Sequence, residues 1–493
     1  MSYSSSQDFA GPRIPFPIPT GRLIPVLVLA AVAAAFGAAH AQIVINTYFE
    51  VIVDNLDDST FSTPGCTLRD AVASLNAGSN VDGCLRAVRT GSQPNTIVFD
   101  PTLFPGQIFL EDELAVTSPL RIAGSETLTL EISGQNQSRI FRVTDTGSLE
   151  VEHLTLQQGY TQTVGGAILS AAPVTLRHCE VNSSRADDYG GGVVATDLIV
   201  EHCTFDGNRS NLGGAIGNVG TLRVVDSVFS NNEATGSDGG GAIVIESSVA
   251  EILQSRFVSN SALAGGAILT AQSFFATTTV IASTFENNRA TSGFGSSIRQ
   301  LGGEALVQQS LFIDTPDSRD EWQIYQLTPS TKMQIENSTF TGNDGIAAES
   351  DITLLHVTMT LTPPQASATI SLERESTTAR IRDSIFTAMG NQGCRGSNAN
   401  VVENRSNIFS INLCPETGPN IIASDAQLGP LQDNGGPTLS RAPLPGSPSV
   451  NAASIFCLPT DQRGFDRGNI PCDIGAVELD ASGALFRDGF ESP

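Results

Sequence analysis

The chain has 493 residues, of which 47 are glycine and only 16% are charged. Asp and Glu number 51 and Lys and Arg 26, so the net charge is −25, and Lys332 is the only lysine. These values exclude a basic nucleic-acid-binding face, which needs clustered cations, and a coiled coil, which needs far more charge. Length alone allows about three ordinary domains, and 40% hydrophobic residues suffice to fill a core, so we expect a large, glycine-rich, acidic β protein.

Residues 1–41 are typical of a secretory signal peptide. An apolar run over residues 23–36 follows two arginines and precedes the small-residue motif Ala39-His40-Ala41. Such a run is short for a membrane span, so we predict cleavage before Gln42, with an N-terminal membrane anchor as the alternative. No second run of about 20 apolar residues occurs, so we expect no transmembrane span in the mature chain.

The eight cysteines fall into pairs that are close in sequence. The pairs are Cys66 with Cys84, Cys179 with Cys203, Cys394 with Cys414, and Cys457 with Cys472. An even number of cysteines in an exported chain favours disulfides. Zinc binding is the alternative, but no pair has the spacing of two to four residues that zinc ligands show.

A repeat of about 25 residues organises the middle of the chain. Its most regular column consists of Leu156, Val181, Phe205, Phe229, Phe257, Phe285, Phe312, Phe340, Met359 and Phe386. A second column lies two residues earlier and begins Leu154, Cys179, Cys203, Ser227; a third, five residues earlier, is aliphatic in every copy. Residues two positions apart point to the same face of a strand, so the first two columns can share one strand. The third column lies three residues before the second, and this odd separation would change the face unless the chain bends between them. With a further apolar segment around pairs such as Gly213-Gly214, each repeat should supply three short strands.

Such a repeat cannot bury its inward side chains alone, but stacked copies form a continuous core. The sequence therefore predicts an all-β fold, a parallel β-helix with coils about 4.8 Å apart. A β-propeller is excluded because its blades need roughly 40 to 50 residues. Cys179 and Cys203 would occupy adjacent coils of an inward column, and we favour a disulfide between them over two stacked thiols.

Asparagine follows the column phenylalanine by three residues in five repeats. The pairs are Phe205 and Asn208, Phe229 and Asn232, Phe257 and Asn260, Phe285 and Asn288, and Phe340 and Asn343. Asparagine tolerates a left-handed backbone, and its amide can bond neighbouring coils, so we interpret these residues as structural.

The repeat resembles that of polymorphic outer membrane proteins, as in Phe205-Asp206-Gly207-Asn208 followed by Gly213-Gly214-Ala215-Ile216. The resemblance covers about residues 150–345 and implies a surface-displayed, right-handed β-helix of the pectate-lyase-like type, often adhesive. That family commonly ends in an autotransporter barrel, for which the residues after Cys414 are too few.

A motif on the N-terminal side of the repeats resembles a module of exported bacterial proteins. Gly65-Cys66-Thr67-Leu68-Arg69-Asp70-Ala71 is similar to the Cys-Ser-Leu-Arg-Glu-Ala (CSLREA) motif, with Thr67 and Asp70 as departures. We expect a short helix over residues 69–77 that covers the first coil, within an N-terminal cap of residues 42–115.

The C-terminal motifs resemble the choice-of-anchor Q domain, a module of exported proteins with varied anchors. They are Leu428-Gly429-Pro430-Leu431-Gln432-Asp433-Asn434-Gly435-Gly436-Pro437-Thr438, Pro445-Gly446-Ser447-Pro448, Asp461-Gln462-Arg463-Gly464 and Cys472-Asp473-Ile474-Gly475-Ala476-Val477-Glu478. This assigns residues 116–415 to the β-helix, 416–480 to the module and 481–493 to a tail whose Phe486-Arg487-Asp488-Gly489-Phe490-Glu491 looks like a terminal signature.

Candidate binding chemistry is sparse. His153, His178 and His202 precede the column residue by three positions on successive coils and could share a metal, but the column continues through residues that bind metals poorly, which favours a polar bend. We assign no metal or cofactor site. Calcium is the one cofactor left open, with weak candidates in Asp54, Asp57, Asp58, Asp187 and Asp188.

Two functions follow from these observations. The first is a secreted or surface-displayed scaffold that binds a glycan or protein ligand, in the envelope of a Gram-negative-type cell. The second is a polysaccharide lyase or hydrolase, for which Arg185, Asp187, Asp188 and Arg209 form the nearest charged cluster. Because a solvated acidic loop explains that cluster equally well, we assign no catalytic residue and favour the scaffold.

Overall fold

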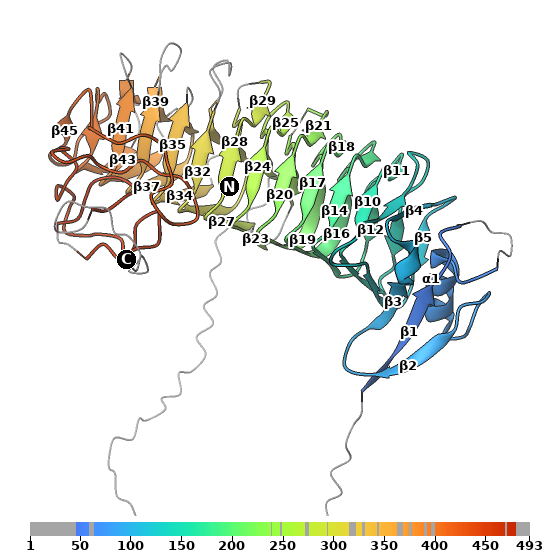
Figure 1. Ribbon diagram of the computed structural model, residues 1–493. Helices are drawn as coiled ribbons and strands as arrows, with labels where there is room; N and C mark the ends of the chain where they lie inside the picture. The colour runs from blue at the N-terminus through green and yellow to red at the C-terminus, as the bar shows by residue number, and fades with distance from the viewer. Residues whose placement is uncertain are drawn as a thin grey trace, which may run out of the picture. The chain divides into compact units, whose positions relative to one another are not determined.

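The computed structural model describes residues 46–479, with gaps at 59–63, 238, 247–248, 272–275, 293, 315–321, 328–330, 343–344, 362–367, 373, 375–376, 389–391, 396–399 and 469–470. The expected signal peptide, Asn343 and the tail after residue 480 lie outside the described residues. The described chain is an all-β parallel β-solenoid of about 11 turns with little helix, which confirms the predicted fold class (Figure 1).

The largest sheet, sheet 1, is built from two series of strands. The first series is β5 (Leu114–Val116), β8 (Phe141–Val143), β12 (Ile168–Ser170), β16 (Val193–Glu201), β19 (Ile216–Val225), β22 (Ile243–Ile245), β26 (Ile268–Thr270), β30 (Ile298–Gln300), β33 (Ile324–Gln326), β36 (Ile346–Ala348), β39 (Ala368–Leu372) and β42 (Gln392–Arg395). The second series is β1 (Thr47–Val53), β3 (Asn95–Phe99), β6 (Pro119–Ala123), β9 (Ser148–Glu152), β13 (Val174–Arg177), β23 (Val249–Leu253), β27 (Thr277–Ile281), β31 (Glu304–Gln308), β34 (Lys332–Glu336), β37 (Asp351–Leu355), β40 (Thr378–Arg382) and β43 (Asn400–Arg405). The long strands β16 and β19 run through both series.

Two further sheets complete each coil. Sheet 2 contains β4 (Gly106–Phe109), β7 (Leu130–Ser133), β10 (Thr155–Gln157), β14 (Glu180–Asn182), β17 (Thr204–Asp206), β20 (Val228–Ser230), β24 (Arg256–Val258), β28 (Thr284–Glu286), β32 (Leu311–Ile313), β35 (Thr339–Gly342), β38 (Thr358–Leu361), β41 (Ile385–Ala388), β44 (Ile408–Phe409) and β45 (Ile421–Ile422). Sheet 3 contains two-residue strands that the sequence did not predict: β11 (Tyr160–Thr161), β15 (Arg185–Ala186), β18 (Arg209–Ser210), β21 (Glu233–Ala234), β25 (Ser261–Ala262) and β29 (Arg289–Ala290).

The column phenylalanines form the centre of the core. Phe205, Phe229, Phe257, Phe285 and Phe340 are completely buried, and successive rings from residue 205 to 340 stack with centroids 4.4 to 5.0 Å apart. The parallel registers place each ring directly over the next, for example Phe205 over Phe229. The periodicity read from the sequence is therefore the stacking period of the coils.

A left-handed residue makes the corner between sheet 1 and sheet 2 and explains the odd step in the repeat. The residues three positions before the column all have φ between 44° and 55°; they are His153, His178, His202, Asp226, Gln254, Ala282, Gln309, Asn337, His356 and Asp383. One left-handed residue bends the chain from sheet 1 to sheet 2, and the side chains after the bend again point inward. We call this row the corner column.

The asparagines after the column phenylalanines form a buried ladder. Asn208 Nδ2 donates to Asn232 Oδ1 at 3.0 Å, and Asn232 Nδ2 donates to Asn260 Oδ1 at 2.9 Å. The amides thus bond neighbouring coils, but the expected left-handed backbone at Asn208 was wrong. The left-handed residue at this bend is the preceding one, Gly207 at φ 63°, because the asparagine backbone must turn inward for its side chain to reach the core.

The N-terminal cap contains β1, β3, the helix α1 (Leu68–Ala77), the edge strand β2 (Arg86–Thr90) and the short 3-10 helix η1 (Pro101–Leu103). Thr67 caps α1 by accepting a hydrogen bond from Asp70 N at 3.2 Å. The buried face of α1, which includes Leu68 and Val72, joins the core cluster of the solenoid. The motif residue Arg69 forms an ion pair with the buried Asp58 at 2.6 Å, which holds the helix against the first coils.

Residues 426–479, which we call the C-terminal module, pack along the solenoid, and their described part contains no helix or extended strand (Figure 1). Thr438 Oγ1 donates to the carbonyl of Gln309, and Gly475 N donates to that of Asp383. Gly475 is needed at this approach, since a Cβ there would lie 2.7 Å from Ile385 Cδ1. The module therefore covers the corner column from residue 309 to residue 383.

Three disulfides join Cys66 to Cys84, Cys394 to Cys414, and Cys457 to Cys472. Disulfides persist in oxidising compartments, so these bonds indicate an extracellular or periplasmic setting. Across the described ranges, none of the helices has the length and apolar character that spanning a membrane requires.

Candidate functional site

A groove of about 480 Å³ lies on the outer face of sheet 1, over β27, β31, β34, β37 and β40. Alternate residues of these strands, such as Met333 and Ile352, point into the core and are buried. The residues between them face outward and stack in register as two rows. One row is Thr277, Glu304, Lys332, Asp351 and Thr378, and the other is Thr279, Leu306, Gln334, Thr353 and Arg380.

The charges in this groove are balanced. Lys332 Nζ lies 2.8 Å from Glu304 Oε1, and both side chains are more than half exposed. The hydrogen bond and the charge of Glu304 raise the pKa of Lys332, so its ammonium stays protonated. Asp351 follows Lys332 in the same row, and Arg380 follows Thr353 in the other. The groove thus offers hydrogen-bond donors and acceptors of both charges on an otherwise acidic chain.

The same face continues toward the N-terminus as a ladder of ion pairs. Arg177 Nε lies 3.0 Å from Glu201 Oε2, and its Nη1 lies 3.3 Å from Glu152 Oε1. Arg121 forms an ion pair with Glu152 from the other side. Although partial burial acts in the opposite direction, the hydrogen bond and charge of Arg121 and the charge of Arg177 lower the pKa of Glu152. A carboxylate in this state is ionised and cannot serve as a general acid.

The three histidines of the corner column do not converge on one point. The imidazole rings of His153, His178 and His202 stack with centroids 4.8 Å apart and line a second groove of about 390 Å³. His202 Nδ1 lies 3.0 Å from Asp226 Oδ2. Parallel rings one strand spacing apart cannot all place a nitrogen about 2.1 Å from a single ion. Among the described residues, no three His, Cys, Asp or Glu side chains are arranged to hold a metal.

The charged cluster considered for catalysis is engaged in surface ion pairs. Arg185 Nη2 lies 3.0 Å from Asp187 Oδ1, and Tyr160 Oη donates to Asp187 Oδ2 at 3.2 Å. Arg209 pairs instead with Glu233 at 3.3 Å. Both arginines are more than half exposed, and Asp188 contributes its backbone N–H to the carbonyl of Thr163. These contacts describe a solvated corner of sheet 3.

The aspartates considered for calcium have structural partners in the cap. Asp54 Oδ1 accepts from Cys66 N at 2.6 Å, and Asp57 Oδ1 accepts from Asp58 N at 3.0 Å. Asp58 also accepts from Glu111 N at 2.8 Å, in addition to its ion pair with Arg69. Since these oxygens already receive hydrogen bonds from the protein, the structure gives a packing role for them.

The expected disulfide between Cys179 and Cys203 is absent, and both residues are buried free cysteines. Cys203 Sγ accepts from Cys179 N at 3.3 Å, and Cys179 Sγ donates to the carbonyl of Val151 at 3.2 Å. Side chains stacked in register point the same way, which keeps their Cβ atoms near the strand spacing of about 4.8 Å instead of the 3.8 Å of a disulfide. Burial raises the pKa of Cys203, so this thiol stays protonated.

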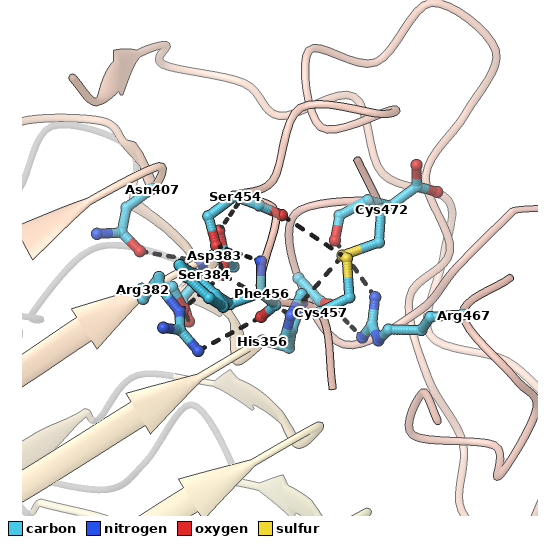
Figure 2. A network of polar contacts seen from close by, with 12 residues as sticks. His356, Arg382, Asp383, Ser384, Asn407, Ser454, Phe456, Cys457, Arg467 and Cys472 are labelled. Atoms are coloured by element: carbon cyan, nitrogen blue, oxygen red, sulfur yellow. Dashed lines mark hydrogen bonds and ion pairs between the residues drawn. A yellow bond between two sulfur atoms is a disulfide. The ribbon is translucent and has the colours of Figure 1, made fainter. Parts of the chain in front are cut away.

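Beneath the C-terminal module the corner column forms a closed polar network (Figure 2). Asp383 accepts from the N and Oγ of Ser454 at 2.6 and 2.8 Å, and Arg382 Nε lies 3.0 Å from Asp383 Oδ2. His356 is fully buried, with Nε2 3.8 Å from Asp383 Oδ2 and 3.9 Å from Cys472 Sγ. Burial, with the nearby charges of Arg467 and Arg382, holds the pKa of His356 well below its usual range.

The motif residues of the module make buried ion pairs. Arg463 donates to Asp461 Oδ2 from Nε and Nη2 at 2.8 and 2.7 Å. Arg467 Nη1 lies 3.0 Å from Glu478 Oε2, and its Nη2 donates to Asn337 Oδ1 at 2.9 Å in the corner column. Burial raises the pKa of Glu478 to about 6. These residues bind the module to the solenoid and are enclosed by it, so they face no ligand.

The groove residues are the ones that sequence reasoning missed. The three aligned columns were all inward positions, whereas the groove uses the positions six and eight residues before the column phenylalanine, such as Gln334 and Lys332. The sequence did contain a pattern that could have revealed them, because polar residues recur at these positions from one repeat to the next. The comparisons with known proteins add no further assignment, because no family model, curated protein or solved structure matches this chain.

Proposed function

We propose that this chain is an exported, surface-displayed scaffold that binds an uncharged polysaccharide along the groove of sheet 1. The observation that carries the proposal is the pair of in-register outward rows on β27, β31, β34, β37 and β40. Hydroxyl, amide and charged groups recur there once per strand, about 4.8 Å apart, which suits an extended ligand with many hydroxyl groups.

The charge of the groove favours a neutral ligand. Glu304 and Asp351 are matched by Lys332 and Arg380, while the whole chain carries −25. A polyanionic glycan would be repelled by that field without finding a basic groove to offset it. Hydroxyl groups both donate and accept, so an uncharged sugar can use acids and bases alike.

Binding without chemistry fits the groove better than catalysis. A lyase needs a base whose pKa lies near the working pH, but contact with Glu304 moves the pKa of Lys332 upward. A hydrolase needs a carboxylic acid kept protonated by burial, but Glu304 is 60% exposed and ion-paired. The resemblances to polymorphic outer membrane protein repeats and the choice-of-anchor Q domain, together with the three disulfides, support display on the outer surface of the cell.

The single lysine allows a direct test. Purified residues 42–493 are incubated with soluble β-glucan, xylan, galactan or polygalacturonate and treated with an amine-acetylating reagent, and acetylation of Lys332 is measured by peptide mass spectrometry. We expect a neutral polysaccharide at ten times its Kd to slow acetylation about ten-fold, because only free protein reacts. The acidic polymer should not protect.

The Arg256→Lys variant supplies the matched control. Arg256 lies on sheet 2, is about as exposed as Lys332 and is likewise paired with a glutamate, Glu286. Its lysine should be acetylated at the same rate with and without polysaccharide. Unprotected Lys332 in every polymer would refute the proposed function, and release of sugar products would establish the enzyme instead.

A further inference from the structure

The C-terminal module presents two exposed apolar residues between two rigid anchors. Ile455 is 69% exposed and Phe456 is 56% exposed. On one side Ser454 is held by two hydrogen bonds to the buried Asp383, and on the other Cys457 is bonded to Cys472. These two anchors hold the apolar pair in a fixed position on the surface of the module.

Phe456 lies beside the end of the groove. Arg382 Nη2 donates to the carbonyl of Phe456 at 3.4 Å, and the guanidinium carbon lies 5.7 Å from the centre of the Phe456 ring (Figure 2). Arg382 belongs to β40 and points outward like Arg380, which lines the groove two residues earlier. The module therefore places an aromatic ring at the β40 end of the polar rows.

We propose that Phe456 is a stacking platform for one sugar ring of the polysaccharide where it leaves the groove at β40. This inference rests on the proposed function of the groove. The axial C–H groups of a sugar ring carry partial positive charge and pack on the negative face of an aromatic ring. A polar groove orients hydroxyl groups but cannot bury the apolar face of a sugar, and Phe456 supplies that surface.

The size of the patch favours a sugar over a protein partner. A stable protein interface buries about 800 Å² on each side, with 20 to 30 residues. Ile455 and Phe456 are only two adjacent residues, flanked by the polar Ser454 and the guanidinium of Arg382. One aromatic ring beside a hydrogen-bonding groove matches the dimensions of a single sugar ring.

The test compares Phe456→Ala with Phe109→Ala. Phe109 is 52% exposed but lies on β4, the first strand of sheet 2. The probes are the β-glucan, xylan and galactan used above, and the readout is the Kd for each polymer that protects Lys332. We expect about ten-fold weaker binding for Phe456→Ala and no change for Phe109→Ala, with binding kept in Phe456→Trp.

The outcomes separate this inference from the proposed function. If Lys332 is protected in the wild type but Phe456→Ala binds as tightly as Phe109→Ala, the platform is refuted and the groove stands. If no neutral polysaccharide protects Lys332, the proposed function fails and the platform fails with it. Thermal melting of each variant confirms the fold, which an exposed side chain should not alter.

Discussion

Single residues set the geometry of each coil through their backbone conformation. His153, Asp226 and Ala282 share little chemistry, yet all three occupy the same left-handed corner. The histidine ladder is thus a consequence of the corner position, and its rings stack because the coils do. The serine column behaves likewise, since Ser227 Oγ accepts from Cys203 N at 3.0 Å as Cys203 Sγ accepts from Cys179 N.

The two buried cysteines give a prediction at this scale. The native protein should expose no reactive thiol, because Cys179 and Cys203 are buried, and the chain unfolded without reductant should show two. Thiol titration with a chromogenic disulfide, before and after addition of guanidinium, measures both numbers. A count of zero in the unfolded chain would mean that the two cysteines are bonded after all.

At the scale of the element, no strand of this fold is stable alone. The strands of sheet 2 are two to four residues long and satisfy their backbone groups only on the coils above and below. The asparagine ladder likewise provides hydrogen bonds between neighbouring coils at the bend after sheet 2. Asn232 receives hydrogen bonds from the N and Nδ2 of Asn208 and donates to the carbonyl of Phe205.

Removal of one rung should destabilise the solenoid. We expect Asn232→Ala to lower the free energy of unfolding by about 2 to 4 kcal/mol, because it leaves several buried donors and acceptors unpaired. Asn211→Ala is the control, since Asn211 is exposed and accepts one hydrogen bond from Thr235. Urea denaturation of both variants measures the difference, and equal midpoints would contradict a structural role for the ladder.

At the scale of the whole molecule, the C-terminal module divides the corner column into two parts. From Gln309 to Asp383 the column is covered by the module, whereas at His178 and His202 it is exposed. In the covered part, the polar groups of the column contact a network of ion pairs and hydrogen bonds instead of solvent. The side chains of Arg467 and Glu478 in this network are fully buried. Such pairs tolerate no missing partner, so the module docks as a unit.

His356 predicts how this docking depends on pH. Its pKa is lowered in the folded state, so below the unfolded value of about 6.5 the unfolded chain binds a proton that the folded chain does not. The stability that His356 contributes is therefore present above pH 6.5 and is lost as the pH falls. Glu478 acts in the opposite direction, because its raised pKa of about 6 favours the folded state as the pH falls through that value.

Comparison with His356→Gln isolates the histidine from the acids and guanidiniums around it, Asp383, Arg382 and Arg467. The wild type should lose stability relative to the variant by up to about 1.4 kcal/mol per pH unit below pH 6.5. Urea denaturation at several values between pH 7.5 and pH 5 measures this slope. A difference that does not change with pH would show that His356 does not remain neutral in the fold.

Much of the fold could be predicted because the solenoid repeats its inward residues in the chain itself. The phenylalanine column and the bend before it recur from coil to coil, and the three disulfides that do form join residues at most 20 positions apart. The bond between Cys179 and Cys203 was predicted wrongly, although both side chains point inward as expected, because side chains stacked in register stay too far apart for a disulfide. The groove was missed because its outward residues do not pack in the core and so carry no packing signal.

By itself, the sequence determined the period, the inward columns and hence the parallel solenoid, because like side chains must stack where each coil has only its neighbours for a core. Only the tertiary structure decided which segments that are distant in the sequence lie next to each other. Arg382 and Phe456 are 74 residues apart, and their contact depends on a module that folds back along the solenoid. No local pattern encodes that contact, because it joins two surfaces that are far apart in the sequence.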